Sequence, residues 1–174
     1  MVEKHPLVGV LMGSDSDLPV MEGAFEVLRK FEIPFETAVL SAHRTPDHAA
    51  RYAETAAGRG LKVLIAAAGW AAHLAGFLAS KTTLPVIGVP IDSSPLKGMD
   101  ALLSTVQMPP GIPVATMAIG KGGARNAALF AVQILALSNE ALSEGLRRYK
   151  ADMASDVLAK NEKIEASVRV RDLA

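Results

Sequence analysis

Residues 7–17 read LVGVLMGSDSD, and this stretch indicates the class of fold. Its first part, residues 7–12, is an uninterrupted apolar run, which predicts a strand buried on both faces of a sheet. The GSDSD that follows consists of residues that favour turns and helix N-caps. From residue 18 to 31, apolar side chains recur at helical spacing. A buried strand that passes directly into an amphipathic helix predicts alternating strands and helices.

The rest of the chain repeats this alternation. We expect further strands at residues 35–40, 62–68, 84–90 and 112–118, and further helices from 46 to 58 or 60, toward residue 80, at 98–106 and at 126–137. Continuous apolar strands separated by helices predict an α/β fold. Its architecture is three-layer: a flavodoxin-like, doubly wound parallel sheet with helices on both faces and right-handed crossovers.

An extra amphipathic helix is expected at residues 140–158, after the sheet is complete. Its apolar side chains form one stripe at helical spacing: Leu142, Leu146, Tyr149, Met153 and Val157. Such a stripe either closes the domain or packs on a neighbouring subunit, and the sequence leaves both interpretations open. We expect residues 160–174 to be a poorly ordered or arm-like tail. The chain, 1–174, is predicted to be a single domain with its core at about 7–137.

Composition excludes several classes of function. The 174 residues contain 18 Lys and Arg against 18 Asp and Glu, so no net charge favours binding to nucleic acid or to an anionic membrane surface. No apolar run reaches the length of about 20 residues that a membrane span needs, and residues 1–6 lack the apolar centre of a signal peptide, so we expect a cytoplasmic protein. The absence of cysteine excludes disulfides, thiolate metal sites and cysteine nucleophiles.

Four loops that follow predicted strands carry polar or glycine-rich motifs. They are GSDSD (13–17), SAHR (41–44), AGWAAH (68–73) and GKGGARN (120–126). In an open parallel sheet, ligands bind at the carboxyl ends of the strands, so we expect these loops to surround one site.

The GSDSD loop has two interpretations. Gly13 allows close backbone approach, while the hydroxyls of Ser14 and Ser16 and the N–H groups at a helix start suit a phosphate. The same residues are also ordinary for a turn and an N-cap, with Asp15 or Asp17 serving the helix. The loop matches neither the P-loop nor the dinucleotide-binding pattern. The later glycines at 120–123 are interpreted as a structural turn before a helix.

SAHR places His43 beside Arg44 at a strand end. Arginine binds phosphate or carboxylate with two parallel hydrogen bonds, and histidine exchanges protons near neutral pH. The alternative is that His43 bonds a backbone carbonyl and Arg44 is a surface charge. His73 lies in a small, apolar loop, where it is either a site residue or a buried histidine bonded to the backbone.

Several kinds of chemistry lack their motifs. His43 and His73 supply no HxH or HxxxH spacing and would need further ligands, so no metal is expected. A serine hydrolase would need a G-x-S-x-G elbow, which is absent. A flavin site would need aromatic residues to sandwich its ring, and no such pair is evident.

The ordered motifs GSDSD, SAHRTP (41–46), AAHLAG (71–76), PVIGVP (85–90) and MDALLSTVQMPPGIPVAT (99–116) resemble those of the N5-carboxyaminoimidazole ribonucleotide mutase family of de novo purine biosynthesis. The resemblance spans about residues 8–137. It implies an isomerase that needs neither cofactor nor metal and moves a carboxyl group from the exocyclic nitrogen of the aminoimidazole ribonucleotide to a ring carbon. It also implies a homo-octamer whose C-terminal helices pack on neighbouring subunits.

By this resemblance, Ser14, Ser16 and Arg44 hold the 5′-phosphate, and Asp17 holds the ribose hydroxyls. His43 is the proton shuttle, and His73 orients the carboxylate or confines CO2. The remaining substrate-binding residues, at the phosphate, base and carboxylate, are Gly13, Ser41, Ala42, Gly69, Ala71, Ala72 and Leu74.

The third loop decides between two branches of the family. His73 in AAHLAG is typical of the mutases, whereas the branch that carboxylates aminoimidazole ribonucleotide directly with CO2 lacks this histidine. Ala75 and Trp70 depart from the proline and the glycine that are common at their positions, which raises the question of loop order and of room in the pocket. The alternatives are therefore the carboxylase and, in another class, a non-catalytic nucleotide-binding module.

Overall fold

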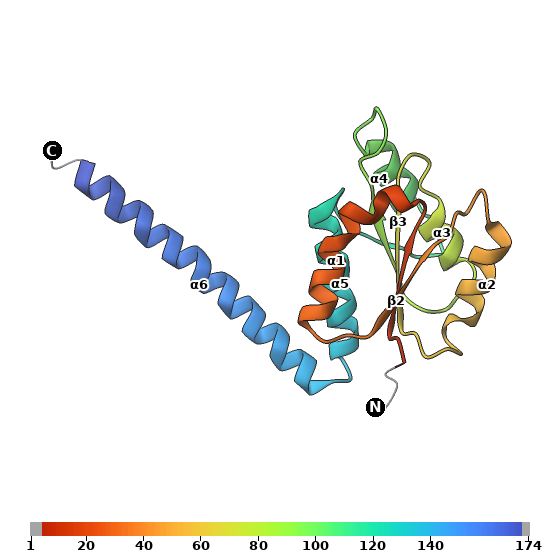
Figure 1. Cartoon of the computed structure of the whole chain (residues 1–174), viewed down its shortest axis with the longest axis horizontal. Coiled ribbons are helices and arrows are strands. Elements are labelled where there is room, and N and C mark those ends of the chain that lie inside the picture. Colours follow the sequence, from red (N-terminus) through yellow and green to blue (C-terminus); the bar gives the residue numbers. More distant parts are fainter. Residues whose placement is uncertain (1–4, 172–174) are drawn as a thin grey trace. The chain divides into compact units, whose positions relative to one another are not determined.

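The computed structural model describes residues 5–171, which form two units: one up to Leu135 and one from Ala136 onward. The division falls close to the end of the core expected near residue 137. In chain order the elements are β1 (Val8–Met12), η1 (Asp15–Asp17), α1 (Leu18–Lys30), β2 (Phe35–Val39), α2 (Pro46–Ala56), β3 (Val63–Ala68), α3 (Leu74–Ala79), β4 (Val86–Pro90), α4 (Met99–Val106), β5 (Ala115–Thr116), α5 (Lys121–Ala136) and α6 (Glu140–Arg171) (Figure 1).

The first unit contains a five-stranded sheet in the order β2-β1-β3-β4-β5, and every pair of neighbouring strands is parallel. Val10 of β1 lies between Thr37 of β2 and Ile65 of β3, which fixes the register at the centre of the sheet. This order confirms the predicted flavodoxin-like, doubly wound fold. The chain passes from β1 outward to β2 and then returns to β3 on the other side of β1. Loops diverge at that switch point, which leaves room for a ligand.

Helices cover both faces of the sheet. Figure 1 shows α1 and α5 side by side on one face and α2 and α3 on the other. Small residues allow this close packing, since the buried positions of α2 are Ala49, Ala53 and Ala56. Together with side chains of α3 and the sheet they form one apolar cluster, which includes Leu11, Leu64, Leu74 and Leu78. Burial of this apolar surface stabilises the fold by roughly 25 cal/mol per Å².

The fifth strand is shorter than predicted. The sequence indicated a strand at 112–118, but β5 comprises only Ala115 and Thr116, which pair with Ile87 and Gly88 of β4. Pro113 has no N–H group to donate to β4, so the paired part of the strand begins only after it. The prediction overestimated the strand because the apolar pattern takes no account of the missing donor.

Helix α5 begins at Lys121 rather than at residue 126. Only Gly120, whose φ is 77°, serves as the turn that the sequence predicted for 120–123. Gly123 lies in the first turn of the helix for a different reason: a Cβ there would lie 1.6 Å from the carbonyl oxygen of Ala118. Its role is therefore close contact between helix and loop.

We expect Gly123→Ala to lower the free energy of unfolding by about 2 kcal/mol, because the Ala118 backbone must move to admit the methyl group. Gly122→Ala is the matched control, since open space surrounds that position in the same helix, and the better helix propensity of alanine should leave the stability unchanged or raise it by up to about 1 kcal/mol. Urea unfolding at one fixed protein concentration measures both. Coincident curves for the two variants would contradict the packing role of Gly123.

The second unit consists essentially of α6, which continues to Arg171, past the end predicted near residue 158. The expected tail is therefore helical as far as Arg171, and residues 172–174 lie outside the described part of the chain. No proline or glycine follows residue 158 in this segment, so nothing in the sequence ends the helix. Asn139 accepts a hydrogen bond from the Leu142 N–H at its start, and Arg147 pairs with Glu140 and Glu144.

Among residues 5–171, no helix combines the length and the apolar character that a membrane span requires.

Candidate active site

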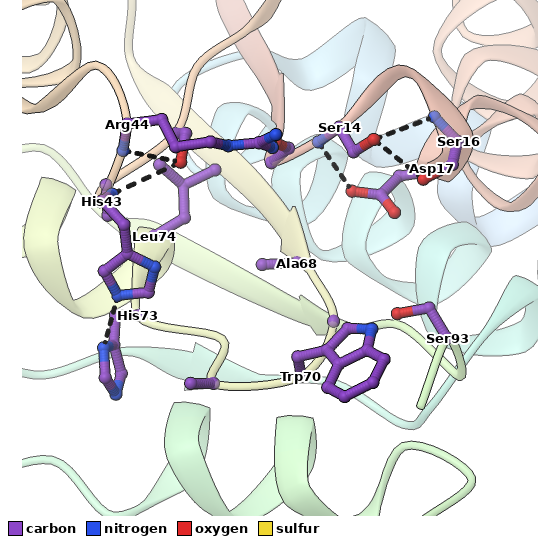
Figure 2. Close-up of a pocket in the computed structure, with 15 residues that line it drawn as sticks. Ser14, Ser16, Asp17, His43, Arg44, Ala68, Trp70, His73, Leu74 and Ser93 are labelled. Carbon is purple, nitrogen blue, oxygen red and sulfur yellow. Dashed lines mark hydrogen bonds between the residues drawn. The ribbon is translucent and has the colours of Figure 1, made fainter. Parts of the chain in front are cut away.

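A cavity of about 670 Å³ lies at the carboxyl ends of β1, β2 and β3. Figure 2 shows the side chains that line it. They are Gly13, Ser14, Ser16, Asp17, Ser41, Ala42, His43, Arg44, Ala68, Gly69, Trp70, Ala71, His73, Leu74 and Ser93. The structure thus brings together three of the four loops that the sequence singled out, although they are distant in sequence.

Of the residues predicted for the site, only Ala72 is absent from the lining. Its side chain is 1% exposed and packs into the core instead. The loop at 120–126 does not line the cavity either, because β5 lies at the edge of the sheet, away from the switch point. Conversely, Ser93 was missed. It follows β4, and the same rule about the carboxyl ends of strands would have pointed to it.

The GSDSD loop is a complete capping box. The Ser14 hydroxyl accepts a hydrogen bond from the Ser16 N–H at 3.3 Å, and the Asp17 carboxylate accepts one from the Ser14 N–H at 3.2 Å. Asp17 is 3% exposed, whereas the Ser16 side chain faces solvent. The capping interpretation is therefore correct for Ser14 and Asp17. The Ser16 hydroxyl takes no part in the cap; it lines the cavity, and its Oγ lies 2.9 Å from the Oγ of Ser14.

Burial raises the pKa of Asp17, and hydrogen bonds from the backbone at Ser14 and Gly13 offset part of that rise. The folded protein therefore holds the Asp17 proton more tightly than the unfolded chain does. It follows that stability falls as the pH rises through the window between the unfolded and the folded pKa. Above this window the full cost of burying the charge is present.

Asp17→Asn should therefore raise the melting temperature at pH 7, by no more than a few degrees. The amide oxygen of asparagine still accepts the Ser14 N–H, so the cap persists while the buried charge is removed. Scanning calorimetry at pH 7 and near pH 4 would measure the effect, and the advantage of the variant should shrink in acid. A variant that melts earlier than the parent at pH 7 would show that the charged form is needed for folding.

Ser41 shapes the second loop. Its hydroxyl accepts hydrogen bonds from the backbone N–H groups of His43 at 3.3 Å and Arg44 at 3.1 Å, and its own N–H donates to Thr45. Proline at position 46 then begins α2. The backbones of His43 and Arg44 are thus fixed by the turn that presents their side chains.

Arg44 joins the first and second loops. Its Nη2 donates to the carbonyl oxygen of Gly13 at 3.2 Å, so the guanidinium lies beside the loop of Ser14 and Ser16 (Figure 2). One positive charge and two hydroxyls converge at this end of the cavity. Charge-assisted hydrogen bonds from such a set suit a phosphate group.

His43 and His73 contact one another across the second and third loops. The Nε2 of His43 and the Nδ1 of His73 are 2.8 Å apart, and the rings lie edge to face at 79°. One nitrogen of this pair must donate and the other accept. Both side chains are exposed to the cavity, so neither of the alternatives considered for them, a histidine bonded to a backbone carbonyl and a buried structural histidine, describes the structure.

The third loop is closely packed although Trp70 and Ala75 replace the glycine and the proline that the sequence resemblance leads us to expect. A Cβ at Gly69 would lie 1.9 Å from the Ser93 hydroxyl, so the loops after β3 and β4 are in close contact there. Trp70 has a φ of 54°, the left-handed region that favours glycine. Ala75 is buried in the first turn of α3, which begins at Leu74.

Within residues 5–171, no three His, Asp or Glu side chains converge as they would around a metal ion. The cavity instead combines a cationic end with two hydroxyls, a buried carboxylate, a histidine pair and an apolar wall. These groups are suited to binding a phosphorylated small molecule and to transferring a proton on it.

Comparison with known proteins agrees with this chemistry. Residues 7–156 match the sequence model of a family described as AIR carboxylase. The chain is 54% identical over 165 residues to the N5-carboxyaminoimidazole ribonucleotide mutase of Pyrococcus horikoshii. The aligned region covers 95% of this chain and 92% of that protein. It is 54% identical over 160 residues to the mutase of Bacillus subtilis, covering 92% and 99% of the two chains.

Solved structures give the same picture. The crystal structure of Treponema denticola PurE superposes with a TM-score of 0.81 at 29% identity and covers 91% of this chain and 98% of that one. The crystal structure of a PurE2 variant from the same organism has a TM-score of 0.83 at 28% identity, with 92% and 98% covered.

Proposed function

The chain belongs to the AIR carboxylase family, and on this premise we propose that its pocket performs the N5-carboxyaminoimidazole ribonucleotide mutase reaction of purine biosynthesis, with His43 carrying the proton. The protein is an enzyme, an isomerase, like the relatives that share more than half of its residues over nearly the whole chain. The observation that carries the proposal is the paired His43 and His73 at one side of a cavity whose other end holds Arg44 and two serine hydroxyls.

The phosphate end of the substrate binds at the first and second loops. Arg44 and the hydroxyls of Ser14 and Ser16 hold the 5′-phosphate, and Gly13 lets the backbone approach it closely. Asp17 accepts hydrogen bonds from the ribose hydroxyls. The capping box supports this assignment because it orders the loop before any ligand arrives, which lowers the entropy cost of binding.

The reaction at the other end is a decarboxylation followed by a recarboxylation. The bond between the exocyclic nitrogen and its carboxylate breaks, CO2 forms, and the nitrogen takes a proton from His43. The ring carbon, now electron-rich, attacks the CO2, and the proton on that carbon returns to His43. If CO2 stays in the cavity, this second step is effectively intramolecular and gains the large rate advantage of proximity. One histidine donates and accepts in turn, so no net proton is exchanged with solvent.

His73 acts through His43. Its Nδ1 lies at hydrogen-bonding distance from the His43 Nε2, so its tautomer sets which nitrogen of His43 carries the proton. Carboxylate and base then contact backbone groups of Ser41, Ala42, Gly69, Ala71 and Leu74. Ala68 and Leu74 form an apolar part of the cavity lining. CO2 finds no polar group to bind there, so it stays available to the ring carbon.

An assay in both directions tests the function. Purified protein given either carboxylated isomer should interconvert them, and the ultraviolet spectrum records the change without dependence on added bicarbonate. The rival activity within the family is direct carboxylation, which would instead consume aminoimidazole ribonucleotide and CO2. Turnover that requires bicarbonate would therefore show that the protein is a carboxylase and not a mutase. Tight nucleotide binding with no turnover in either assay would favour a non-catalytic module.

Ser16→Ala should raise KM by about tenfold, the loss of one charge-assisted hydrogen bond, with kcat and stability unchanged. Ser14→Ala is the informative contrast, because Ser14 also caps the helix and its loss should lower the free energy of unfolding by about 1 kcal/mol. Steady-state kinetics and urea unfolding of both variants separate the two roles. If KM is unchanged in both variants, the loop does not bind the phosphate and serves only as a turn.

The protein assembles as a homo-oligomer, which we place in the cytoplasm and expect to be an octamer. One side of α4 supports the assembly: Met99, Leu103 and Val106 follow each other at helical spacing and are about half exposed, at 51, 49 and 48%. The apolar residues of α6 are the second candidate interface. Light scattering should report a mass eight times that of the chain, and Leu103→Glu should lower it. A monomeric parent protein would contradict the assembly.

A further inference from the structure

Trp70 occupies an unusual position in the wall of the pocket. It is the only tryptophan of the chain, it lines the cavity, and it is 59% exposed. Its φ of 54° is a conformation that a bulky side chain rarely adopts. Strained residues of this kind cluster at functional sites, where the surrounding structure holds them in place.

Contacts on both sides hold the backbone of Trp70. On one side, Gly69 lies so close to the next loop that a Cβ would meet the Ser93 hydroxyl at 1.9 Å and the Ile91 carbonyl oxygen at 3.3 Å. On the other side, the His73 N–H donates to the Ala71 carbonyl at 2.8 Å. The indole is therefore presented from a fixed backbone, as a preformed wall of the cavity.

The position of this wall relative to the other groups is informative. Figure 2 shows Ser14, Ser16, Asp17 and Arg44 along one side of the cavity, and Trp70 with Ser93 along the opposite side. The histidine pair occupies a third side. A nucleotide whose phosphate lies at Arg44 and whose reacting atoms lie at His43 has its flat heterocycle between these groups. Apart from the two imidazoles, Trp70 is the only aromatic ring among the lining residues.

We propose that the Trp70 indole packs against the face of the aminoimidazole ring and thereby selects substrates that carry a planar base. This role rests on the proposed function. Stacking of a base on an aromatic side chain typically changes affinity by a factor of about 5 to 150. A residue that merely filled space would serve equally well as leucine, whereas stacking requires a ring.

The sole tryptophan provides a direct measurement. Titration of the parent protein with carboxyaminoimidazole ribonucleotide should change the tryptophan emission and protect it from quenching by acrylamide. Ribose 5-phosphate, which lacks the base, should inhibit competitively but leave acrylamide quenching unchanged. If the nucleotide saturates the enzyme without protecting Trp70, the indole does not contact the base and the proposal fails.

Kinetics of two variants complete the test. Trp70→Phe keeps a ring and should keep KM within about threefold, while Trp70→Leu should raise KM about tenfold with kcat nearly unchanged. Equal KM values for the leucine variant and the parent would overturn the stacking role even though the mutase activity stands. A parent protein that interconverts neither isomer would instead overturn the proposed function, so the two failures are distinguishable.

Discussion

His43→Asn is expected to lower kcat for the interconversion of the two carboxylated isomers by about 10³-fold, with KM within about threefold of the parent. Asparagine has a similar size and still forms hydrogen bonds, but it has no group that takes up and releases a proton near neutral pH. The position of His43 beside His73 and at the cavity surface means that the variant should bind substrate normally and fail at the proton-transfer steps.

Two further histidines serve as controls for this prediction. His48→Asn should retain full activity, because His48 is an exposed residue of α2 outside the lining of the cavity. His73→Asn should lower kcat by an intermediate factor, about tenfold, because in the proposed mechanism His73 only sets the tautomer of His43, and the variant keeps His43 as the proton carrier. Steady-state kcat values of the three variants test whether His43 carries the proton. A His43→Asn enzyme with the parental kcat would assign the proton transfer to another group.

The order of strands and helices was predictable because the strands are continuous apolar runs and the helices between them carry apolar side chains at helical spacing. The rule that ligands bind at the carboxyl ends of parallel strands then located the cavity from GSDSD and SAHR. Errors arose where a pattern ignores individual atoms. The N–H group missing from Pro113 delays the start of β5, and the absence of a glycine or proline after residue 158 lets α6 continue to Arg171.

The finer geometry of the site depends on three-dimensional register. His43 and His73 are 30 residues apart and lie in loops that follow different strands, β2 and β3. Their contact follows from the alignment of these strands on either side of β1 and from the turn that Ser41 stabilises. The sequence marks Trp70 as unusual, yet its left-handed backbone and its place in the cavity wall emerge only when Gly69 is seen against Ser93. Motifs therefore identify which residues matter, and packing decides how they cooperate.

Arg44→Met should raise KM by about 100-fold with little change in kcat, because in the proposed binding mode the guanidinium holds the phosphate by charge-assisted hydrogen bonds and the phosphate takes no part in the reaction. Methionine preserves much of the apolar stem and removes the charge. The bond from Arg44 to the Gly13 carbonyl is also lost, but the capping box of Ser14 and Asp17 still orders that loop. The variant should therefore fold normally.

Arg51→Met is the matched control, since Arg51 is an exposed arginine of α2 outside the lining of the active-site cavity. Arg44→Lys should recover only part of the affinity, because an ammonium group restores the charge without the two parallel hydrogen bonds of a guanidinium. Inorganic phosphate supplies an independent measurement: it should inhibit the parent competitively and the Arg44→Met variant far less. If phosphate inhibits both equally, the anion binds elsewhere, and the cationic end of the cavity holds the substrate carboxylate instead.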